Sequence, residues 1–344
     1  MLSLMVAGGV ALWLAGLLTP VLVRRLKARE IGQHIREDGP ESHSVKAGTP
    51  TMGGIVIVGA MIVGFLLGHM GTHVGLTRAG ALVCFAVAGF GLIGFLDDIT
   101  KVRNRRSLGL NKRAKSLLQL LFGTIFAVLA VFWVHTATTL SVTRATLPGW
   151  QLSKAGWIVL AVLVIVGTSN AVNLTDGLDG LAAGSSTFCF SVLAIIGYWQ
   201  FRHFSIYHLG SALDLGLTAV ALAGACLGFL WWNAAPAKIY MGDTGSLAIG
   251  AGLAAMCLLM NLDLLLVVIG GLFVIETLSV IIQVFSFRVF GRRVLKMAPI
   301  HHHFELLDWP ETTVIVRFWI LAGLFSAFGL GLFYADFLNV AKVV

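Results

Sequence analysis

The chain has 344 residues, of which 58% are hydrophobic and only 12% are charged. Because a soluble domain carries about 25% charged residues, this composition excludes an ordinary soluble globular protein. The net charge of +8 would suit a nucleic-acid-binding protein, but the charges lie in short segments between apolar runs, as in membrane proteins, and we therefore exclude nucleic acid as a partner.

The N-terminal apolar stretch runs from Leu2 to Val23 and is followed directly by Arg24 and Arg25. It has no basic segment before it, and its length is that of a spanning helix rather than of the short apolar core of a signal peptide. We therefore expect the first stretch to be a retained transmembrane helix.

Further apolar runs continue along the whole chain, and each crossing of the hydrocarbon core needs roughly 20 apolar residues. We expect an all-α, polytopic membrane protein with about ten transmembrane helices. No segment is long enough for a soluble domain, so residues 1–344 form a single membrane domain. Gly270, Gly271 and Glu276 could mark a bend in the ninth run, although a straight helix fits equally well. The runs are 2–23, 51–68, 79–96, 117–134, 155–173, 181–199, 214–232, 245–260, 264–287 and 313–335.

Lysine and arginine are distributed unevenly between alternate loops. If the N-terminus is outside, most of the 24 basic residues fall in inner segments. The positive-inside rule therefore predicts that both termini are periplasmic or extracellular. The remaining polar clusters fall on the inner side, at the ends of helices, which is where an active site at a membrane surface would lie.

The first cluster is Asp97-Asp98, which closes the third run and is followed by Lys101. Neighbouring carboxylates repel one another and are costly at the lipid boundary. A divalent cation relieves both costs, and Mg²⁺ favours one or two carboxylates together with substrate phosphates. A solvated helix end is the plainer alternative.

The second cluster places amide and acid side chains at a regular spacing of three. This spacing keeps them near one face if the stretch is helical, and glycines after the two acids permit a sharp turn. An ordinary loop is the alternative. The four residues are Asn170, Asn173, Asp176 and Asp179.

The third cluster runs from Asn233 to Ser246 and contains Lys238, Tyr240 and Asp243. Its glycines and the helix that follows resemble a phosphate or nucleotide loop, because a helix N-terminus attracts anions. The order of a P-loop is absent, and an ordinary loop is an equal alternative.

The fourth cluster is the triplet His301, His302 and His303. Three consecutive side chains cannot readily face one zinc ion, and no cysteine partners accompany them. Imidazoles that contact phosphates are the favoured interpretation. A structural histidine tract remains an alternative.

Together these segments resemble the polyprenyl-phosphate N-acetylhexosamine-1-phosphate transferases. The triple histidine and the Gly-Thr-Pro-Thr-Met-Gly-Gly segment resemble the phospho-N-acetylmuramoyl-pentapeptide transferase branch. The resemblance covers nearly the whole chain through 46–54, 97–101, 109–115, 170–179, 233–246 and 298–305.

The resemblance implies transfer of phospho-N-acetylmuramoyl-pentapeptide from its UDP carrier to undecaprenyl phosphate, giving lipid I and UMP with Mg²⁺ as cofactor. It implies a multi-pass enzyme of the bacterial inner membrane, surrounded by membrane lipid, with a cytoplasmic active site. A homodimer is left open, because no sequence feature decides the oligomeric state. Attack of one phosphate on another brings negative charges together, so catalysis would rest on cations and positioning. An aspartate acting as a base is favoured over a covalent nucleophile.

The resemblance also implies residue roles. Asp97, Asp98 and Asp243 would form the catalytic and metal-binding centre, with Asp243 the foremost direct ligand. Tyr240, where the family usually has Phe, would stack on uracil beside Thr51, Asn173 and Asp176. Lys46, Lys115 and His301 would contact phosphates, with His301 also catalytic. The other predicted substrate-binding residues are Asn170, Asp179, Asn233, Gln283, His302 and His303.

Two other functions were weighed against this one. A sister transferase that uses a different UDP-sugar would share the aspartate motifs. An ion or metal transporter would place its ionisable residues near the bilayer midplane. Nearly all such residues here lie at helix ends, which favours the transferase.

Overall fold

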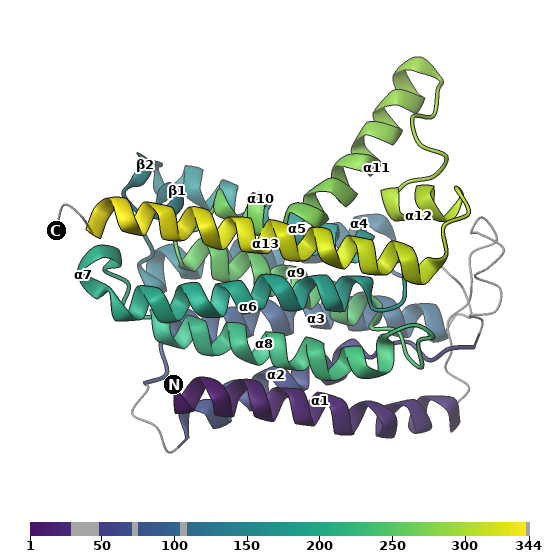
Figure 1. Cartoon of the computed structure of the whole chain (residues 1–344), viewed down its shortest axis with the longest axis horizontal. Helices are drawn as coiled ribbons and strands as arrows, with labels where there is room; N and C mark the ends of the chain where they lie inside the picture. Colours follow the sequence, from purple (N-terminus) through teal and green to yellow (C-terminus); the bar gives the residue numbers. More distant parts are fainter. Residues whose placement is uncertain (29–47, 71–74, 104–108, 342–344) are drawn as a thin grey trace.

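The structure is a computed structural model that describes residues 1–28, 48–70, 75–103 and 109–341. Over these residues the chain is mostly helical, which confirms the predicted fold class, and nine helices are long and apolar enough to cross a membrane. The chain is a multi-pass membrane protein (Figure 1). Its elements are α1 (Leu2–Ala28), α2 (Gly54–His69), α3 (Arg78–Arg103), α4 (Lys112–Leu129), the π-helical turn η2 (Ala130–Val134), β1 (Thr139–Arg144), β2 (Leu147–Gln151), α5 (Lys154–Thr175), α6 (Leu181–Arg202), α7 (Phe204–Tyr207), α8 (Ala212–Asn233), α9 (Gly242–Leu259), α10 (Leu265–Ile269), α11 (Gly271–Phe290), α12 (Ile300–Glu305) and α13 (Glu311–Ala341).

Each of the ten predicted apolar runs contains a helix, but the helix of the second run is short. α2 has 16 residues, so it is about 24 Å long, whereas the hydrocarbon core is about 30 Å thick. The residues before α2 stay outside the helix because they pair with the segment that precedes α9. Tyr240 donates its backbone N–H to the Pro50 carbonyl (2.8 Å), and Gly53 donates to the Tyr240 carbonyl (2.9 Å). The second helix therefore begins at Gly54, three residues later than predicted.

The ninth predicted run is broken rather than straight. α10 ends at Ile269, and α11 begins at Gly271 and projects away from the other helices (Figure 1). The break lies where Gly271 packs against α13. A Cβ at Gly271 would lie only 2.6 Å from ring atoms of Phe325, so this close approach requires glycine. The bend that the sequence left open is present.

The mostly helical fold also contains one short hairpin that the sequence did not predict. β1 and β2 form a two-stranded antiparallel hairpin between η2 and α5. The hairpin is anchored to the helices because the buried Asp263 carboxylate accepts a hydrogen bond from the Ser141 backbone N–H (3.0 Å). The strands have only six and five residues, so they do not form an apolar run of spanning length. A prediction that rests on such runs therefore missed them.

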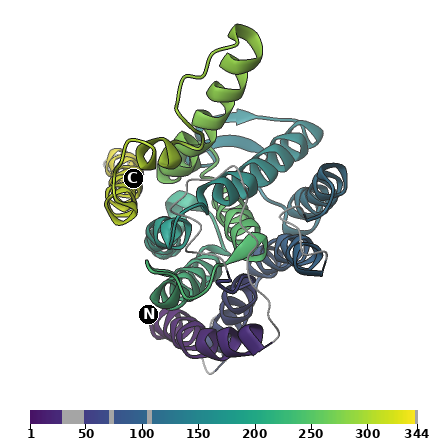
Figure 2. The same ribbon diagram turned by 90° about the vertical axis from the view of Figure 1, so that its right-hand side faces the viewer.

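α9 is the central helix of the bundle. All of its residues from Thr244 to Leu259 are buried, and the view along the helices shows α9 surrounded by its neighbours (Figure 2). Small residues permit this enclosure. A Cβ at Gly94 of α3 would overlap the backbone of Asp243, and a Cβ at Gly54 of α2 would overlap the backbone of Gly245. Both helices therefore touch the N-terminal turn of α9 backbone to backbone.

The two ends of the bundle differ in what they carry. Both chain termini lie at the end that holds the hairpin and α7, whereas α12 lies at the opposite end (Figure 1). The loops that contain the predicted site residues gather at the α12 end, because the start of α9 packs on the last turns of α3. The apolar runs thus alternate in direction, as the charge distribution requires.

Acidic residues at the end with the termini serve structural roles. The Asp214 carboxylate is buried and accepts hydrogen bonds from the Thr77 backbone N–H (2.8 Å) and hydroxyl (2.6 Å), and His69 Nε2 lies 2.8 Å away. Asp336 pairs with the Arg144 guanidinium (3.0 Å). These acids join helices to each other and to the hairpin, so they are not inert surface carboxylates.

The contact between α3 and α9 can be tested by a glycine-to-alanine substitution, which adds one methyl group. We expect Gly94→Ala to lower the free energy of unfolding by about 1–3 kcal/mol, because the added Cβ forces the two backbones apart. Gly59→Ala is the matched control, since its Cβ would meet open space and alanine favours a helix by about 1 kcal/mol. Thermal unfolding in detergent measures both. A Gly94→Ala protein as stable as Gly59→Ala would contradict the packing described.

Candidate functional site

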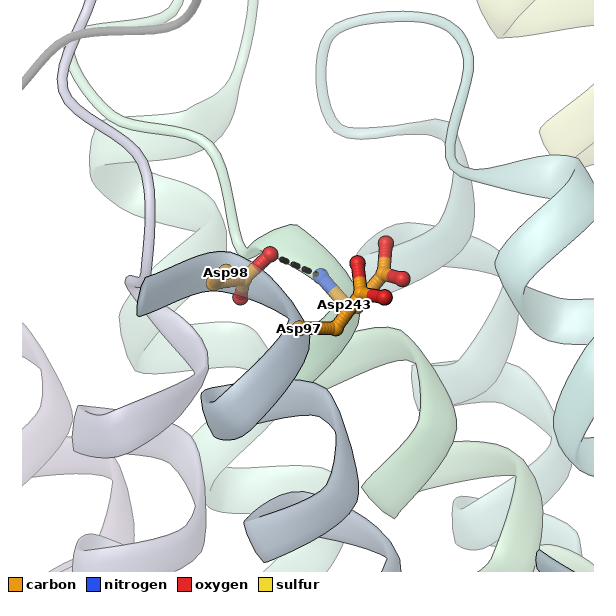
Figure 3. A group of neighbouring side chains, drawn as sticks. All are labelled: Asp97, Asp98 and Asp243. Carbon is orange, nitrogen blue, oxygen red and sulfur yellow. Dashed lines mark hydrogen bonds between the residues drawn. The ribbon is translucent and has the colours of Figure 1, made fainter. Parts of the chain in front are cut away.

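Three carboxylates from two helices meet at the α12 end of the bundle. Asp97 and Asp98 lie near the end of α3, and Asp243 lies in the first turn of α9 (Figure 3). One oxygen from each lies within 4.8 Å of the others. Asp97 and Asp98 are only 3% and 1% exposed, so their charges are largely removed from water. The structure therefore brings together the three acids that the sequence placed on one side.

Two lysines compensate this buried negative charge. Lys101 Nζ lies 2.7 Å from Asp97, 3.0 Å from Asp243 and 3.7 Å from Asp98. Lys115, from the first turn of α4, donates a hydrogen bond to Asp243. Lys115 was predicted as a site residue, whereas Lys101 was noted beside the acids and given no role. The signal was its spacing of four from Asp97 within one helix.

Asp98 differs from its neighbours because its oxygens cap the N-terminus of α9. It accepts hydrogen bonds from the backbone N–H groups of Asp243 (3.1 Å) and Thr244 (3.0 Å), and from the Thr244 hydroxyl (2.6 Å). A carboxylate at this position is favoured by the helix dipole. Gly242 has a φ of +68°, and a Cβ there would lie 2.5 Å from an Asp98 oxygen.

The interpretation of 233–246 as an open phosphate loop is therefore wrong at the start of α9. The N-terminus that would attract an anion is already occupied by Asp98. The glycines of this segment allow backbones to approach: Gly242 contacts Asp98, and Gly245 contacts α2 through Gly54. Local composition suggested anion binding, but a carboxylate distant in sequence satisfies the same N–H groups.

The residues present fit a hard divalent cation. Carboxylate oxygens are the ligands that Mg²⁺ prefers in proteins. Asp97 and Asp243 could hold such an ion, because their carboxylate oxygens lie side by side. The Asp97 oxygens also face Lys101 and the Leu110 N–H (3.0 Å). Asp98 has fewer free lone pairs, since α9 occupies most of them.

The end of α5 supplies the next side chains. Asn173 donates hydrogen bonds to Asp243 (3.1 Å) and to the Ser246 hydroxyl (2.7 Å), so it touches the acidic centre directly. Asp176 follows α5 as its C-cap. Burial, followed by the carboxylates of Asp243 and Asp98, raises the pKa of Asp176 well above its usual range.

Three predicted substrate-binding residues instead bind other parts of the protein. Asp179 accepts a hydrogen bond from the Ala237 N–H (2.8 Å), which ties the turn after α5 to the loop before α9. The Asn233 side chain is buried and donates to the Ile239 carbonyl (2.9 Å) within that loop. Asn170 exchanges hydrogen bonds with Gln119 of α4 (3.1 and 3.4 Å). These hydrogen bonds fix the backbone around the site.

Two further predicted residues lie on the rim of the acidic centre. Thr51 is next to Gly242, because its hydroxyl would lie 2.9 Å from a Cβ placed there. Tyr240 is half-buried, and its backbone is fixed by the pairing with Pro50. Lys46 lies outside the described residues.

The three histidines have three different partners. They therefore do not form a zinc site together. His301 is buried, and its Nδ1 lies 3.0 Å from Glu276 Oε2. His302 Nδ1 lies 2.6 Å from Glu305. His303 Nδ1 accepts a hydrogen bond from the Lys296 N–H (3.1 Å).

Gln283 uses both ends of its amide on the segment after α11. Its oxygen accepts hydrogen bonds from the backbone N–H groups of Val294 (3.0 Å) and Leu295 (2.9 Å), and its nitrogen donates to the Leu295 carbonyl (2.9 Å). This residue was predicted to bind substrate. In the structure it fixes the chain that leads from α11 to the histidines.

Comparisons with known proteins agree with this geometry. Residues 80–261 match the model of "Glycosyl transferase family 4", and residues 46–58 match "Phospho-N-acetylmuramoyl-pentapeptide-transferase signature 1". Three relatives carry the name phospho-N-acetylmuramoyl-pentapeptide-transferase. The protein from Frankia casuarinae is 51% identical over 98% of this chain and 99% of its own length; that from Streptomyces griseus is 47% identical over 97% and 98%; and that from Saccharopolyspora erythraea is 46% identical over 99% of each. At this identity over the full length, the chain belongs to the phospho-N-acetylmuramoyl-pentapeptide transferase family.

Proposed function

We propose that this enzyme transfers phospho-N-acetylmuramoyl-pentapeptide from its UDP carrier to undecaprenyl phosphate, giving lipid I and UMP for peptidoglycan synthesis. The observation that supports the chemistry is the cluster of three acids and two lysines at one end of a membrane helix bundle. A water-soluble nucleotide and a lipid phosphate can meet only near such a boundary. Release of UMP by purified protein, with and without undecaprenyl phosphate, tests the proposal.

The lysines would act on the phosphates. Attack of the lipid phosphate on the diphosphate brings several negative charges together, so positive groups lower the barrier. Lys101 and Lys115 reach Asp243 in the structure, and their ammonium groups can turn toward a phosphate that enters beside it. A bound Mg²⁺ would supply further charge neutralisation between the carboxylates and the diphosphate. Asp97 and Asp243 would hold it, with Asp98 fixing the helix that carries Asp243.

The nucleotide would lie beside the end of α5. Asn173 and Asp176 offer an amide and a carboxyl there, and Thr51 and Tyr240 border the same region. Aromatic rings stack on bases with little dependence on substituents. We assign the uridine to this side because its hydrogen-bonding groups need polar partners, whereas the polyprenyl chain needs lipid.

The site would face the cytoplasm, with both termini outside. This orientation rests on the positive-inside rule, since most lysines and arginines lie in the loops at the site's end of the helices.

The acidic centre gives the sharpest prediction. We expect Asp98→Asn and Asp243→Asn to remove nearly all turnover, through loss of the α9 cap and of the foremost metal ligand respectively. Activity should also disappear with a chelator and return with Mg²⁺. UMP release measures each case, and size-exclusion chromatography checks folding.

The matched control for these substitutions is Asp308→Asn. Asp308 is exposed and adopts a left-handed conformation that asparagine also tolerates. Asp214 is unsuitable as a control because it is buried and bound to Thr77. Full activity of Asp243→Asn, or of wild-type enzyme in chelator, would contradict the metal-centred site.

Stacking on Tyr240 predicts a ring-dependent effect. Tyr240→Ala should weaken use of the UDP-linked substrate by about 1–3 kcal/mol, as for other aromatic–base stacks. Tyr240→Phe should be nearly silent because the ring remains. Steady-state kinetics with varied nucleotide substrate measures both variants. If the Phe variant loses as much as the Ala variant, the hydroxyl rather than the ring carries the interaction.

The orientation can be tested by cysteine labelling of intact cells. A cysteine at exposed position 146, in the hairpin turn, should react with an impermeant reagent added outside. A cysteine at exposed position 307, beside α12, should react only after the membrane is opened. The unsubstituted chain is the background control, since three of its four cysteines are buried and Cys84 is partly buried. Labelling of position 307 from outside would reverse the topology.

A further inference from the structure

Glu276 and His301 form a buried contact that the proposed mechanism does not use. Both side chains are 0% exposed, and Nδ1 and Oε2 are 3.0 Å apart. Neither side chain forms a hydrogen bond with another group among the described residues. Each therefore depends on the other for compensation. A buried carboxylate in an apolar helix is costly unless it is paired.

Glu276 begins a polar stripe along α11. Glu276, Ser279, Gln283 and Ser286 follow a spacing of three, four and three, which places them on one face of the helix. Ser279 accepts a hydrogen bond from the Ile300 N–H (3.0 Å), and Ser286 donates to the Arg292 carbonyl (2.8 Å). Gln283 binds Val294 and Leu295, so the stripe contacts the segment from Arg292 to His301 near both of its ends.

The other side of His301 faces the turn after α5. A Cβ at Gly177 would overlap His301 Nε2 and would lie 3.3 Å from His302 Nε2. The two imidazoles pack on each other with centroids 4.2 Å apart. Gly177 lies between Asp176 and Asp179, the turn assigned above to the nucleotide side. His301 is thus enclosed between a carboxylate of α11 and this turn.

We propose that Glu276 is a positioning residue for the nucleotide side of the site, acting through His301 on the turn from Asp176 to Asp179. This inference rests on the proposed function. The Glu276 carboxylate fixes the position of the His301 imidazole, and the imidazole in turn fixes the position of Gly177. Asp176 and Asn173 precede that glycine, and Asn173 contacts Asp243 (3.1 Å). A shift of His301 would therefore move the groups assigned to uridine before it moved the lysines.

The test compares Glu276→Gln with a control, Thr277→Val. Among the described residues, the Thr277 hydroxyl binds the Phe273 carbonyl of its own helix and nothing else. We expect Glu276→Gln to raise the KM for the UDP-linked substrate about tenfold, because small misplacements are costly in a preorganised site. The KM for undecaprenyl phosphate should stay within about twofold, and UMP binding measured by calorimetry should weaken in parallel. Thr277→Val should leave all three unchanged.

A second pair of variants tests the route through Gly177. Gly177→Ala should give the same selective rise in KM, since its methyl group presses on His301. Glu276→Gln and Gly177→Ala together should be less than additive, because both act on one contact. Additive effects would overturn the proposal.

The remaining outcomes are also decisive. Wild-type enzyme that releases no UMP would refute the proposed function. Active wild-type enzyme with an unchanged nucleotide KM in Glu276→Gln, or with both KM values raised equally, would refute this inference alone. If Glu276→Gln does not fold, Glu276→Asp keeps the charge but is one methylene shorter. It should raise the nucleotide KM selectively, and an unchanged value there would overturn the proposal.

Discussion

The carboxylate of Asp98 and the N-terminus of α9 form the contact on which the site depends. α9 is the buried centre of the bundle, so its first N–H groups must find partners inside the protein. Asp98, from the neighbouring helix α3, accepts hydrogen bonds from two of these N–H groups and a third from the Thr244 hydroxyl. Gly94 and Gly242 let the two backbones approach closely enough for those bonds. The same contact sets where Asp243 projects, so the packing of the membrane core determines the geometry of the acidic centre.

The lysines that compensate the carboxylates around this contact can turn to a substrate phosphate instead. Three carboxylates face two ammonium groups, and Lys101 is shared by all three acids. A lysine is a flexible point charge rather than a rigid fork, so it can leave a carboxylate for a phosphate without rearranging the backbone. Asp97 and Asp243 would hold a divalent cation, which would supply further positive charge. The site is therefore stable without substrate and still able to receive several negative charges.

Local patterns predicted the helices and the shared side of Asp97 and Asp243, whereas the meeting of these acids in one centre was implied by the family resemblance. The length of the apolar runs predicts the transmembrane helices, and the charge of alternate loops predicts that the polar clusters lie on the same side of the membrane. The sequence could not predict that Asp98 caps α9, or that Asn233 and Gln283 bind backbone, because each partner lies elsewhere in the fold. Amide and acid side chains suit ligands and backbone equally well. Motif spacing and family resemblance therefore placed these residues at the site, but the backbone partners that the fold gives them could not be foreseen.

Glu276 shows the converse case, in which a local signal was present but pointed only to a bend. α11 leaves the bundle after Gly271, so it loses most of the helix packing that holds the other spans (Figure 1). Dispersion contacts alone would hold such a helix weakly, since lipid tails offer similar contacts. Polar contacts in a low-dielectric setting are stronger and more directional. A polar stripe on a projecting helix can therefore fix the histidine segment against the nucleotide side, and an acid within an apolar run becomes a sign of such a distant attachment.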